Sequence, residues 1–116
     1  MRRKFRLTKS ADYKRVRRYG KSFAHPLIVL IALNNHLDRT QIAVSSGRSL
    51  GNAVERNRAK RRIRACLQSI MSRIKPGWNI IIIARKPIVQ ANFQQLNNAI
   101  IDVLNKADLL LDNNGN

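Results

Sequence analysis

Six cationic side chains fall between residues 56 and 64 of this 116-residue chain, with a single acid, Glu55, before them. They are Arg56, Arg58, Lys60, Arg61, Arg62 and Arg64. Guanidinium groups pair with phosphate oxygens through a planar fork of N–H donors, so such a set suits a polyanion. An ordinary solvated helix face is the alternative, but it would carry acids four residues away to offset the repulsion. We therefore predict that this stretch binds the phosphates of a nucleic acid.

The histidines and acids of the chain do not have the spacing that a catalytic site would require. His25 and His36 have no companions at the spacing of a metal site or a catalytic triad, and the six acids are scattered along the chain. The lone Cys66 excludes a disulfide framework and a cysteine-based zinc site. The sequence therefore predicts no catalytic residue and no metal ligand in the protein itself.

The net charge of +17 is distributed unevenly along the chain. Residues 1–87 hold 22 lysines and arginines against three acids, a net charge of +19, whereas residues 88–116 carry a net charge of −2. We therefore expect the first three-quarters of the sequence to form the surface that binds a polyanion. We assign residues 1–116 to one domain, with a basic arm at 1–9 and a frayed tail at 111–116.

The composition is that of an ordinary globular domain apart from its charge. A hydrophobic content of 44% in 116 residues is enough to bury a core without disulfides or metals. No apolar stretch approaches the roughly 20 residues of a membrane span, and none has the character of a secretory signal. We therefore expect a cytoplasmic protein that does not bind a membrane.

A helix predicted from residue 53 to about residue 74 would position the cations. Its apolar residues recur every three or four positions and would form one buried stripe. They are Ala59, Ile63, Cys66, Leu67, Ile70 and Ile74. Asn52 is a suitable N-cap, Glu55 completes a capping box, and Pro76 follows the end of the helix. Such a helix would dock by its stripe and expose the cations.

Three β-strands are predicted from short apolar runs rich in β-branched residues. Residues 27–33 and 41–46, separated by a polar turn, are expected to pair as an antiparallel hairpin. Residues 78–84 follow the long helix and complete a strand–helix–strand unit, so they should lie parallel to one of the earlier strands. In the polar link before the helix, Arg48 is placed to reach a phosphate.

Two further helices are expected to flank the sheet. The first covers residues 11–19, with Ser10 as its N-cap and Gly20 at its end. In this helix Tyr13 lies among cations, where its ring would either stack on a base of single-stranded nucleic acid or pack the helix onto the sheet. The last helix begins after Asn92 and should cover the other side of the sheet.

Three stretches of the chain resemble the protein component of bacterial ribonuclease P. GNAVERNRAKRRIR, residues 51–64, is similar to the signature helix of that family, whose centre is the Arg-Asn-Arg triplet found here at 56–58. IIIIARKP at residues 80–87 resembles the last strand of the family and its basic exit, and LTKSADYKRV at 7–16 matches the start of its first helix. The resemblance spans residues 5–107.

The resemblance implies an α/β (α+β) fold. This fold is a small mixed sheet with the order α-β-β-α-β-α, in which the basic helix makes a left-handed crossover between two parallel strands. The resemblance also implies a function, since the family is the small basic subunit of a ribonucleoprotein endonuclease that removes the 5′ leader from precursor tRNA. Its RNA subunit performs the hydrolysis with bound Mg²⁺, so a Mg²⁺ cofactor is expected on the RNA rather than on protein side chains alone.

Site residues are assigned from this resemblance and from the charge pattern. Those expected to contact the RNA subunit are Arg48, Asn52, Arg56, Asn57, Arg58, Lys60, Arg61, Arg62 and Arg64. Those expected to contact the leader, between the first helix and the sheet, are Tyr13, Arg17, Ile31, Arg85 and Lys86. Arg17 and Ile31 stand where the family often has aromatic residues, which implies weaker base stacking here. The implied partners are the ribonuclease P RNA subunit and precursor tRNA, with no obligate protein partner.

Two functions of other classes fit the same charge pattern. A ribosomal or RNA-chaperone protein would bind RNA without stimulating the cleavage of a precursor. A DNA-binding architectural protein would place the arginine-rich helix in a major groove and prefer duplex DNA, although the sequence shows no dimerisation seam. Reconstitution with bacterial ribonuclease P RNA, followed by a precursor-tRNA cleavage assay, would distinguish the three.

Overall fold

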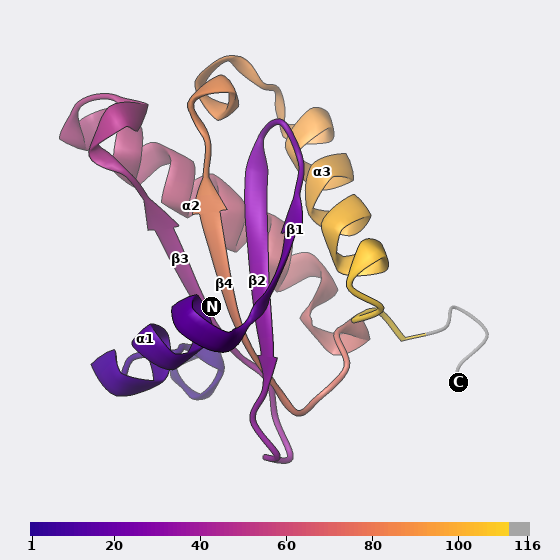
Figure 1. Ribbon diagram of the computed structural model, residues 1–116. Coiled ribbons are helices and arrows are strands. Elements are labelled where there is room, and N and C mark those ends of the chain that lie inside the picture. The colour runs from indigo at the N-terminus through magenta and orange to yellow at the C-terminus, as the bar shows by residue number, and fades with distance from the viewer. Residues whose placement is uncertain (112–116) are drawn as a thin grey trace.

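A four-stranded mixed β-sheet with helices on both faces organises the chain (Figure 1). The computed structural model describes residues 1–111. The helices and strands are, in chain order, α1 (Ser10–Tyr19), β1 (Lys21–Ala24), β2 (Ile28–Asn34), β3 (Gln41–Ser46), α2 (Ala53–Ile70), β4 (Trp78–Ala84) and α3 (Phe93–Lys106). Short 3₁₀ turns are η1 (Arg3–Phe5), η2 (Arg48–Leu50), η3 (Met71–Arg73) and η4 (Lys86–Gln90). None of the helices in the described part of the chain has both the length and the apolar character needed to cross a membrane.

The strand order in the sheet is β1-β2-β4-β3, so the last strand in the sequence lies in the interior. β4 pairs antiparallel with β2 and parallel with β3, where Ile42 lies opposite Ile80. The predicted parallel pairing across the basic helix is therefore confirmed. The predicted hairpin of residues 27–33 with 41–46 is wrong, because β4 lies between those strands. Ile80 and Ile81 point to opposite faces and are both fully buried, which requires an interior position.

The partner of β2 in a hairpin is β1, a strand that the apolar patterns did not predict. β1 has only four residues, of which Phe23 alone is partly buried. Such a short edge strand carries no hydrophobic alternation that would reveal it in the sequence. The observed order of helices and strands is therefore α-β-β-β-α-β-α, one strand more than expected.

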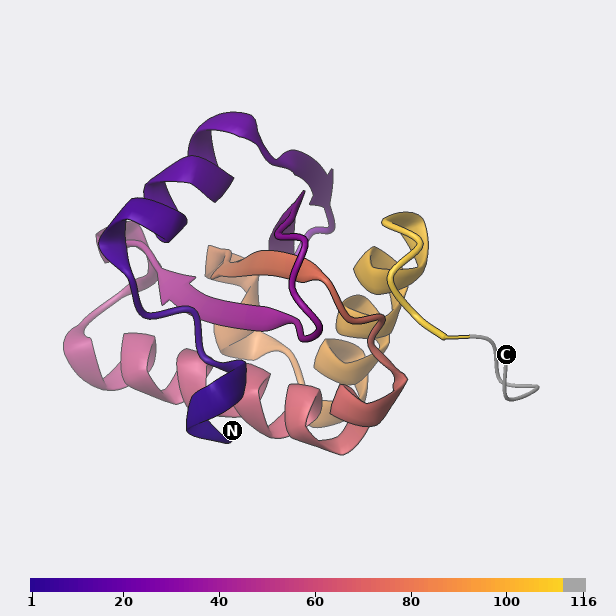
Figure 2. The same ribbon diagram turned by 90° about the horizontal axis from the view of Figure 1, so that it is seen from below.

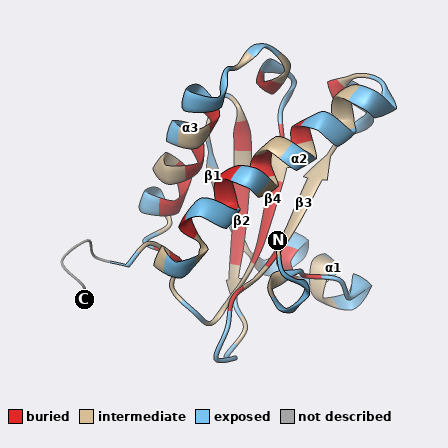
Figure 3. Ribbon diagram, turned by 180° about the vertical axis from the view of Figure 1, so that it is seen from behind, coloured by how far each residue is buried: buried red, intermediate tan, exposed pale blue. Residues whose placement is uncertain are grey.

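The larger core lies between the sheet and helices α2 and α3, which pack side by side on one face (Figure 3). Leu30 and Ile82 line it from the sheet, Ile63 and Leu67 from α2, and Ile100 from α3. The prediction that the last helix covers the opposite face is therefore wrong. Four strands about 4.8 Å apart make a face wider than one helix of about 10 Å diameter, so two helices are needed to cover it.

α1 covers part of the other face of the sheet (Figure 2). Its buried residue, Val16, packs with Leu7, Ile31 and Ile81 in a smaller core. Gly20 follows the last residue of the helix, and an added Cβ atom there would lie 2.6 Å from the Cγ2 atom of Ile31 in β2. Only a residue without a side chain permits this close approach of the helix end to the sheet.

The predicted capping of α2 is confirmed, whereas two other predicted helix boundaries shift. The side-chain oxygen of Asn52 accepts the N–H of Glu55 at 2.9 Å, and the carboxylate of Glu55 accepts the N–H of Asn52. The α-helix ends at Ile70, not near residue 74, because the 3₁₀ turn η3 replaces the last turn and still leaves Ile74 buried. Ser10 is the first residue of α1 and not its cap; the residue before it has the cap position without a side-chain hydrogen bond.

The two ends of the described chain are both tied to the domain. The basic arm predicted at residues 1–9 is docked along β3, since the N–H of the buried Leu7 donates to the carbonyl oxygen of Ile42 at 3.0 Å. At the other end, the N–H of Leu111 donates to the carbonyl oxygen of Arg73 at 2.6 Å. The rest of the predicted frayed tail lies outside the described residues.

Candidate nucleic-acid interface

α2 presents most of its predicted cations to solvent, on the side away from the sheet (Figure 3). Its buried residues are Ala59, Ile63, Cys66, Leu67 and Ile70. Arg58 and Arg61 are exposed, whereas Arg56, Lys60 and Arg64 are partly exposed. Because side chains of one sign repel each other along the helix, burial of the apolar stripe has to stabilise α2 in this position.

The ion pairs found within residues 1–111 involve no side chain of α2. They join Arg39 to Asp38, Lys75 to Asp108, and Lys106 to Asp102. The one acid of α2, Glu55, closes the capping box at the start of the helix. The described acids of the protein therefore do not neutralise the cations of α2, which leaves their charge available to an external polyanion.

Four polar side chains of α2 line one shallow hollow of about 430 Å³. They are Asn57, Lys60, Arg61 and Arg64, and Val54 completes the lining. Residues three and four apart share a helix face, which is why these side chains meet. A concave surface with three cations and an amide offers several N–H donors to the oxygens of a bent phosphate backbone.

Arg62 differs from the other predicted cations because its guanidinium is used inside the protein. Its Nη1 donates to the carbonyl oxygen of Ile88 at 3.0 Å, and its Nη2 donates to the carbonyl oxygen of Ala91. The side chain is partly buried and ties α2 to η4, the turn that follows β4. The structure thus gives Arg62 an internal contact, and its RNA contact stays a prediction. The sequence alone does not distinguish it, because the carbonyl groups belong to a distant turn.

Cys66 lies on the buried stripe of α2, as the sequence predicts. Burial raises the pKa of its thiol, and the positive charge of Arg62 opposes that rise in part. A buried thiol whose thiolate is disfavoured is a packing residue and not a nucleophile.

The link before α2 supplies two of the predicted RNA contacts. Arg48 lies in η2 and its side chain is exposed. Asn52 is also exposed, but its side-chain oxygen is engaged in the cap of α2. An RNA contact by Asn52 would therefore come from the N–H donors of its carboxamide.

Three of the residues expected at the leader lie together beside α1. Tyr13 is partly buried against the smaller core, Arg17 is exposed one turn later, and Ile31 lies beneath the helix with 7% of its surface exposed. Ile31 therefore has little surface with which to contact a ligand. Val29 and Ile83 on the same face of the sheet are partly exposed. Val29 is two residues from Ile31, and Ile83 is two residues from Ile81. The sequence could therefore have placed them on the face that α1 covers, because alternate strand residues share a face.

The other two residues expected at the leader, Arg85 and Lys86, lie beyond the carboxyl end of β4 (Figure 1). There the Nη1 of Arg85 donates to the carbonyl oxygen of His25 at 3.2 Å, in the turn between β1 and β2. α1 packs instead on the middle of the sheet, around Ile31 and Ile81. The five residues therefore form two groups on the protein and not one.

The N-terminal arm extends the cationic surface of α2, a role that the sequence did not predict. The amino group of Met1 donates to the Oε1 atom of Gln68 on α2 at 3.3 Å, which brings the arm beside the second half of the helix (Figure 2). The exposed cations of residues 1–6 are Arg2, Arg3, Lys4 and Arg6. Their charge is evident in the sequence, whereas their place beside α2 depends on the fold.

The described residues contain no group of three His, Cys, Asp or Glu side chains that could hold a metal ion. Asp102 and Asp108 pair with lysines, and Glu55 caps α2. The arrangement thus suits phosphate binding, and these three acids contact groups of the protein itself.

Comparison with known proteins identifies the family. The model of a family described as Ribonuclease P matches residues 1–108. The chain is 37% identical over 112 residues to the ribonuclease P protein component of Herpetosiphon aurantiacus, covering 97% of this chain and 91% of that one. It is 40% identical over 108 residues to the protein component of Listeria monocytogenes, covering 90% and 88% of the two chains. The solved structure of the Staphylococcus aureus RNase P protein matches with a TM-score of 0.83 at 34% identity, covering 91% of this chain and 97% of that chain.

The matched residues include the arm, the sheet and all three helices, so the similarity is not confined to the basic helix. The four-stranded mixed sheet and its helices agree with the solved structure. The chain therefore belongs to the ribonuclease P protein family.

Proposed function

We propose that this chain is the protein subunit of a ribonuclease P ribonucleoprotein, in which it binds an RNA subunit and assists removal of the 5′ leader from precursor tRNA. The observation that carries the proposal is the exposed cationic face of α2, whose side chains form no ion pair with the acids of residues 1–111. Each cation that neutralises a phosphate releases counterions, which favours RNA binding. Because the helix holds these cations in fixed positions, they also orient the protein on the RNA.

The leader is proposed to bind beside α1, where Tyr13 and Arg17 lie one turn apart. Every base has a π-face, so stacking on the ring of Tyr13 would tolerate different leader sequences. The guanidinium of Arg17 would pair with a phosphate, and the partly exposed Val29 and Ile83 would supply apolar surface below. Contact with a single strand upstream of the cut would raise the affinity for precursor tRNA above that for mature tRNA, which lacks the strand.

Bond cleavage is proposed to take place on the RNA subunit, with Mg²⁺ held mainly there. Mg²⁺ prefers octahedral oxygen ligands and is commonly bound through phosphates and water. Residues 1–111 contain no three His, Cys, Asp or Glu side chains that lie close enough together to hold an ion, which supports placing it on the RNA. The protein would neutralise charge and position the two RNAs. We expect this complex in the cytoplasm, without a further obligate protein partner.

Reconstitution tests the proposal. The purified chain is mixed with a bacterial ribonuclease P RNA at low Mg²⁺ concentration, and the cleavage of precursor tRNA is followed against the RNA alone. We expect the protein to raise the rate of leader removal. An RNA-chaperone or ribosomal type of protein would bind the RNA without raising cleavage, and a DNA-binding protein would prefer duplex DNA. Either result would contradict the proposal.

A further inference from the structure

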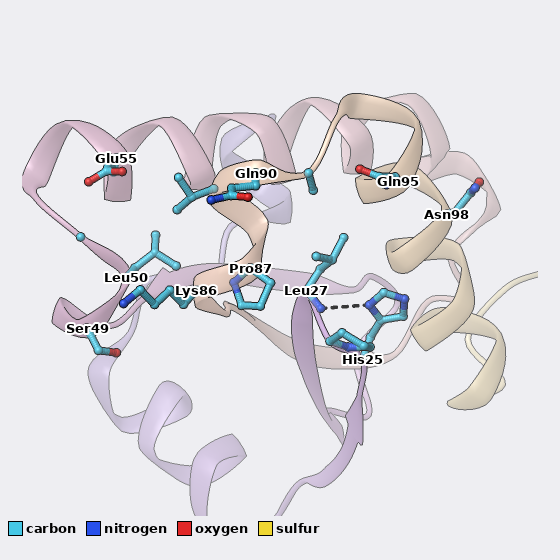
Figure 4. Close-up of a pocket in the computed structure, with 14 residues that line it drawn as sticks. His25, Leu27, Ser49, Leu50, Glu55, Lys86, Pro87, Gln90, Gln95 and Asn98 are labelled. Carbon is cyan, nitrogen blue, oxygen red and sulfur yellow. Dashed lines mark hydrogen bonds between the residues drawn. The ribbon is translucent and has the colours of Figure 1, made fainter.

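A second, larger hollow lies between η4, the start of α3, the β1–β2 turn and η2 (Figure 4). Its volume of about 1030 Å³ is at the upper end of the range of roughly 300–1,000 Å³ that ligand sites occupy. Figure 4 shows Leu50, Glu55 and Lys86 towards one end, Gln95 and Asn98 towards the other, and Pro87 between them. None of these side chains contacts RNA in the function proposed above, and only Lys86 was expected from the sequence to do so.

The lining combines aliphatic surface with side-chain amides. Leu27, Pro87 and Val89 provide the aliphatic surface, since Leu50 in the same lining is only 3% exposed. Asn98 accepts a hydrogen bond from the Nε2 of Gln94 at 3.0 Å through its Oδ1 atom, which leaves its own amide N–H groups as donors towards a ligand. An unstacked base needs this combination, since its face requires an apolar surface and its edge requires donors and acceptors.

The electrostatics of the hollow favour an anionic ligand. The ammonium group of Lys86 lies in its lining, and the N-terminal ends of α2 and α3 both border it, next to Gly51 and Ala91. The carboxylate in the lining, that of Glu55, accepts the N–H of Asn52 at 3.4 Å and is directed to the start of α2. An ammonium group and the N-terminus of α3 attract a phosphate, whereas the N-terminus of α2 already interacts with the carboxylate of Glu55.

One wall of the hollow is fixed by the internal contact of Arg62. Its hydrogen bonds to the carbonyl oxygens of Ile88 and Ala91 hold η4, the turn that brings Lys86 into the lining. The opposite wall ends at Gly51, two residues before the cationic helix begins. An RNA strand bound along α2 would therefore reach the hollow without leaving the surface of the protein.

We propose that this hollow binds an unstacked nucleotide of the RNA subunit. The base lies on the surface of Leu27, Pro87 and Val89, its edge meets the amide of Asn98, and its phosphate lies at Lys86. The inference rests on the proposed function and adds to it. The cations of α2 contact phosphates, which carry no sequence information, whereas this site contacts a base and makes the identity of one nucleotide matter.

A first test uses the free protein and small probes. The four nucleoside 5′-monophosphates and ribose 5-phosphate are each titrated into isotope-labelled protein, and NMR shifts are followed at Gln90 and Asn98. Because base contacts contribute at least about 1 kcal/mol, one or more of the nucleotides should bind about fivefold tighter than ribose 5-phosphate. Equal affinity of all five probes would overturn the assignment of a base site.

A second test fills the hollow in the assembled complex. Asn98→Trp places an indole in the lining, and Asn105→Trp, exposed on the same face of α3 two turns later, is its matched control. Asn98→Trp should weaken binding of the RNA subunit about tenfold and Asn105→Trp less than about twofold, since the control site lies outside the hollow. Equal effects of the two variants on RNA binding would overturn the proposal.

Crosslinking distinguishes the two possible sources of the nucleotide. With 4-thiouridine in the RNA subunit, crosslinks to residues 86–98 are expected; crosslinks from labelled precursor tRNA alone would overturn the assignment to the RNA subunit. If the wild-type protein binds the RNA subunit and the two tryptophan variants bind it equally well, only the nucleotide site in the hollow is refuted. If the wild-type protein does not bind the RNA subunit, the proposed function itself is refuted.

Discussion

Replacing Arg62 with leucine separates the internal contact of this residue from the RNA contacts of its neighbours. The change removes two hydrogen bonds that the guanidinium donates to the carbonyl oxygens of Ile88 and Ala91. Hydrogen bonds to a charged group contribute about 1.5–3 kcal/mol each, and the partial exposure of this side chain places them at or below the lower value. Leucine retains part of the aliphatic packing. The free energy of unfolding should therefore fall by about 2–3 kcal/mol.

Urea denaturation measures this change. Since the slope for a small protein is about 1–3 kcal/mol per molar urea, the midpoint should fall by roughly 0.7–3 M at an unchanged slope. Arg61→Leu is the matched control, because it is the same substitution at an exposed position of the same helix, and it should alter stability by less than about 0.5 kcal/mol. RNA binding should respond in the opposite way, with a weaker salt dependence for Arg61→Leu only. An unchanged midpoint with a weaker salt dependence for Arg62→Leu would show that Arg62 binds RNA.

Three further predictions concern the α1 side and the core. Tyr13→Ala should weaken binding of precursor tRNA by about fivefold or more and leave binding of mature tRNA nearly unaffected, because only the precursor has a leader base that can stack on this ring. Equal losses in the two binding assays would contradict a leader contact. Gly20→Ala should lower stability in thermal denaturation by about 1–3 kcal/mol, since the new Cβ would lie 2.5 Å from the Val16 carbonyl oxygen and 2.6 Å from Cγ2 of Ile31; a wild-type melting temperature would contradict this. Burial raises the pKa of the Cys66 thiol, so the native thiol should react slowly with iodoacetamide, and stability should fall as the pH rises above about 8.5, where the unfolded thiol ionises first. The same fall in Cys66→Ala would contradict that cause.

Local signals in the sequence predicted the elements that carry the site, but not their arrangement. Asn52 and Glu55 defined the start of α2, and residues 78–84 defined β4, because capping and apolar runs act within a few neighbouring residues. The place of β4 between β2 and β3 depends on burial of Ile80 and Ile81 on both faces, which involves the whole sheet. The side covered by α3 likewise depends on how much of the sheet α2 leaves uncovered.

The functional surface was predictable as a charge pattern, and its individual contacts were not. Arg58 and Arg61 are exposed as the helical period indicated. Arg62 belongs to the same run, yet it bonds to carbonyl oxygens of η4, whose position no local pattern defines. The hollow beside Lys86 is lined by four segments that meet only in the folded chain, so no sequence motif predicts it.

The salt dependence of RNA-subunit binding tests most directly whether the exposed cations of α2 contact phosphates. The dissociation constants of the wild-type protein and of the Arg58→Gln, Arg61→Gln double variant are measured from about 50 to 200 mM salt. We predict a log–log slope that is shallower in the double variant by roughly 1.4–1.8 units, about 0.7–0.9 for each lost phosphate contact. An unchanged slope together with an unchanged affinity would contradict a role for this helix face in binding RNA.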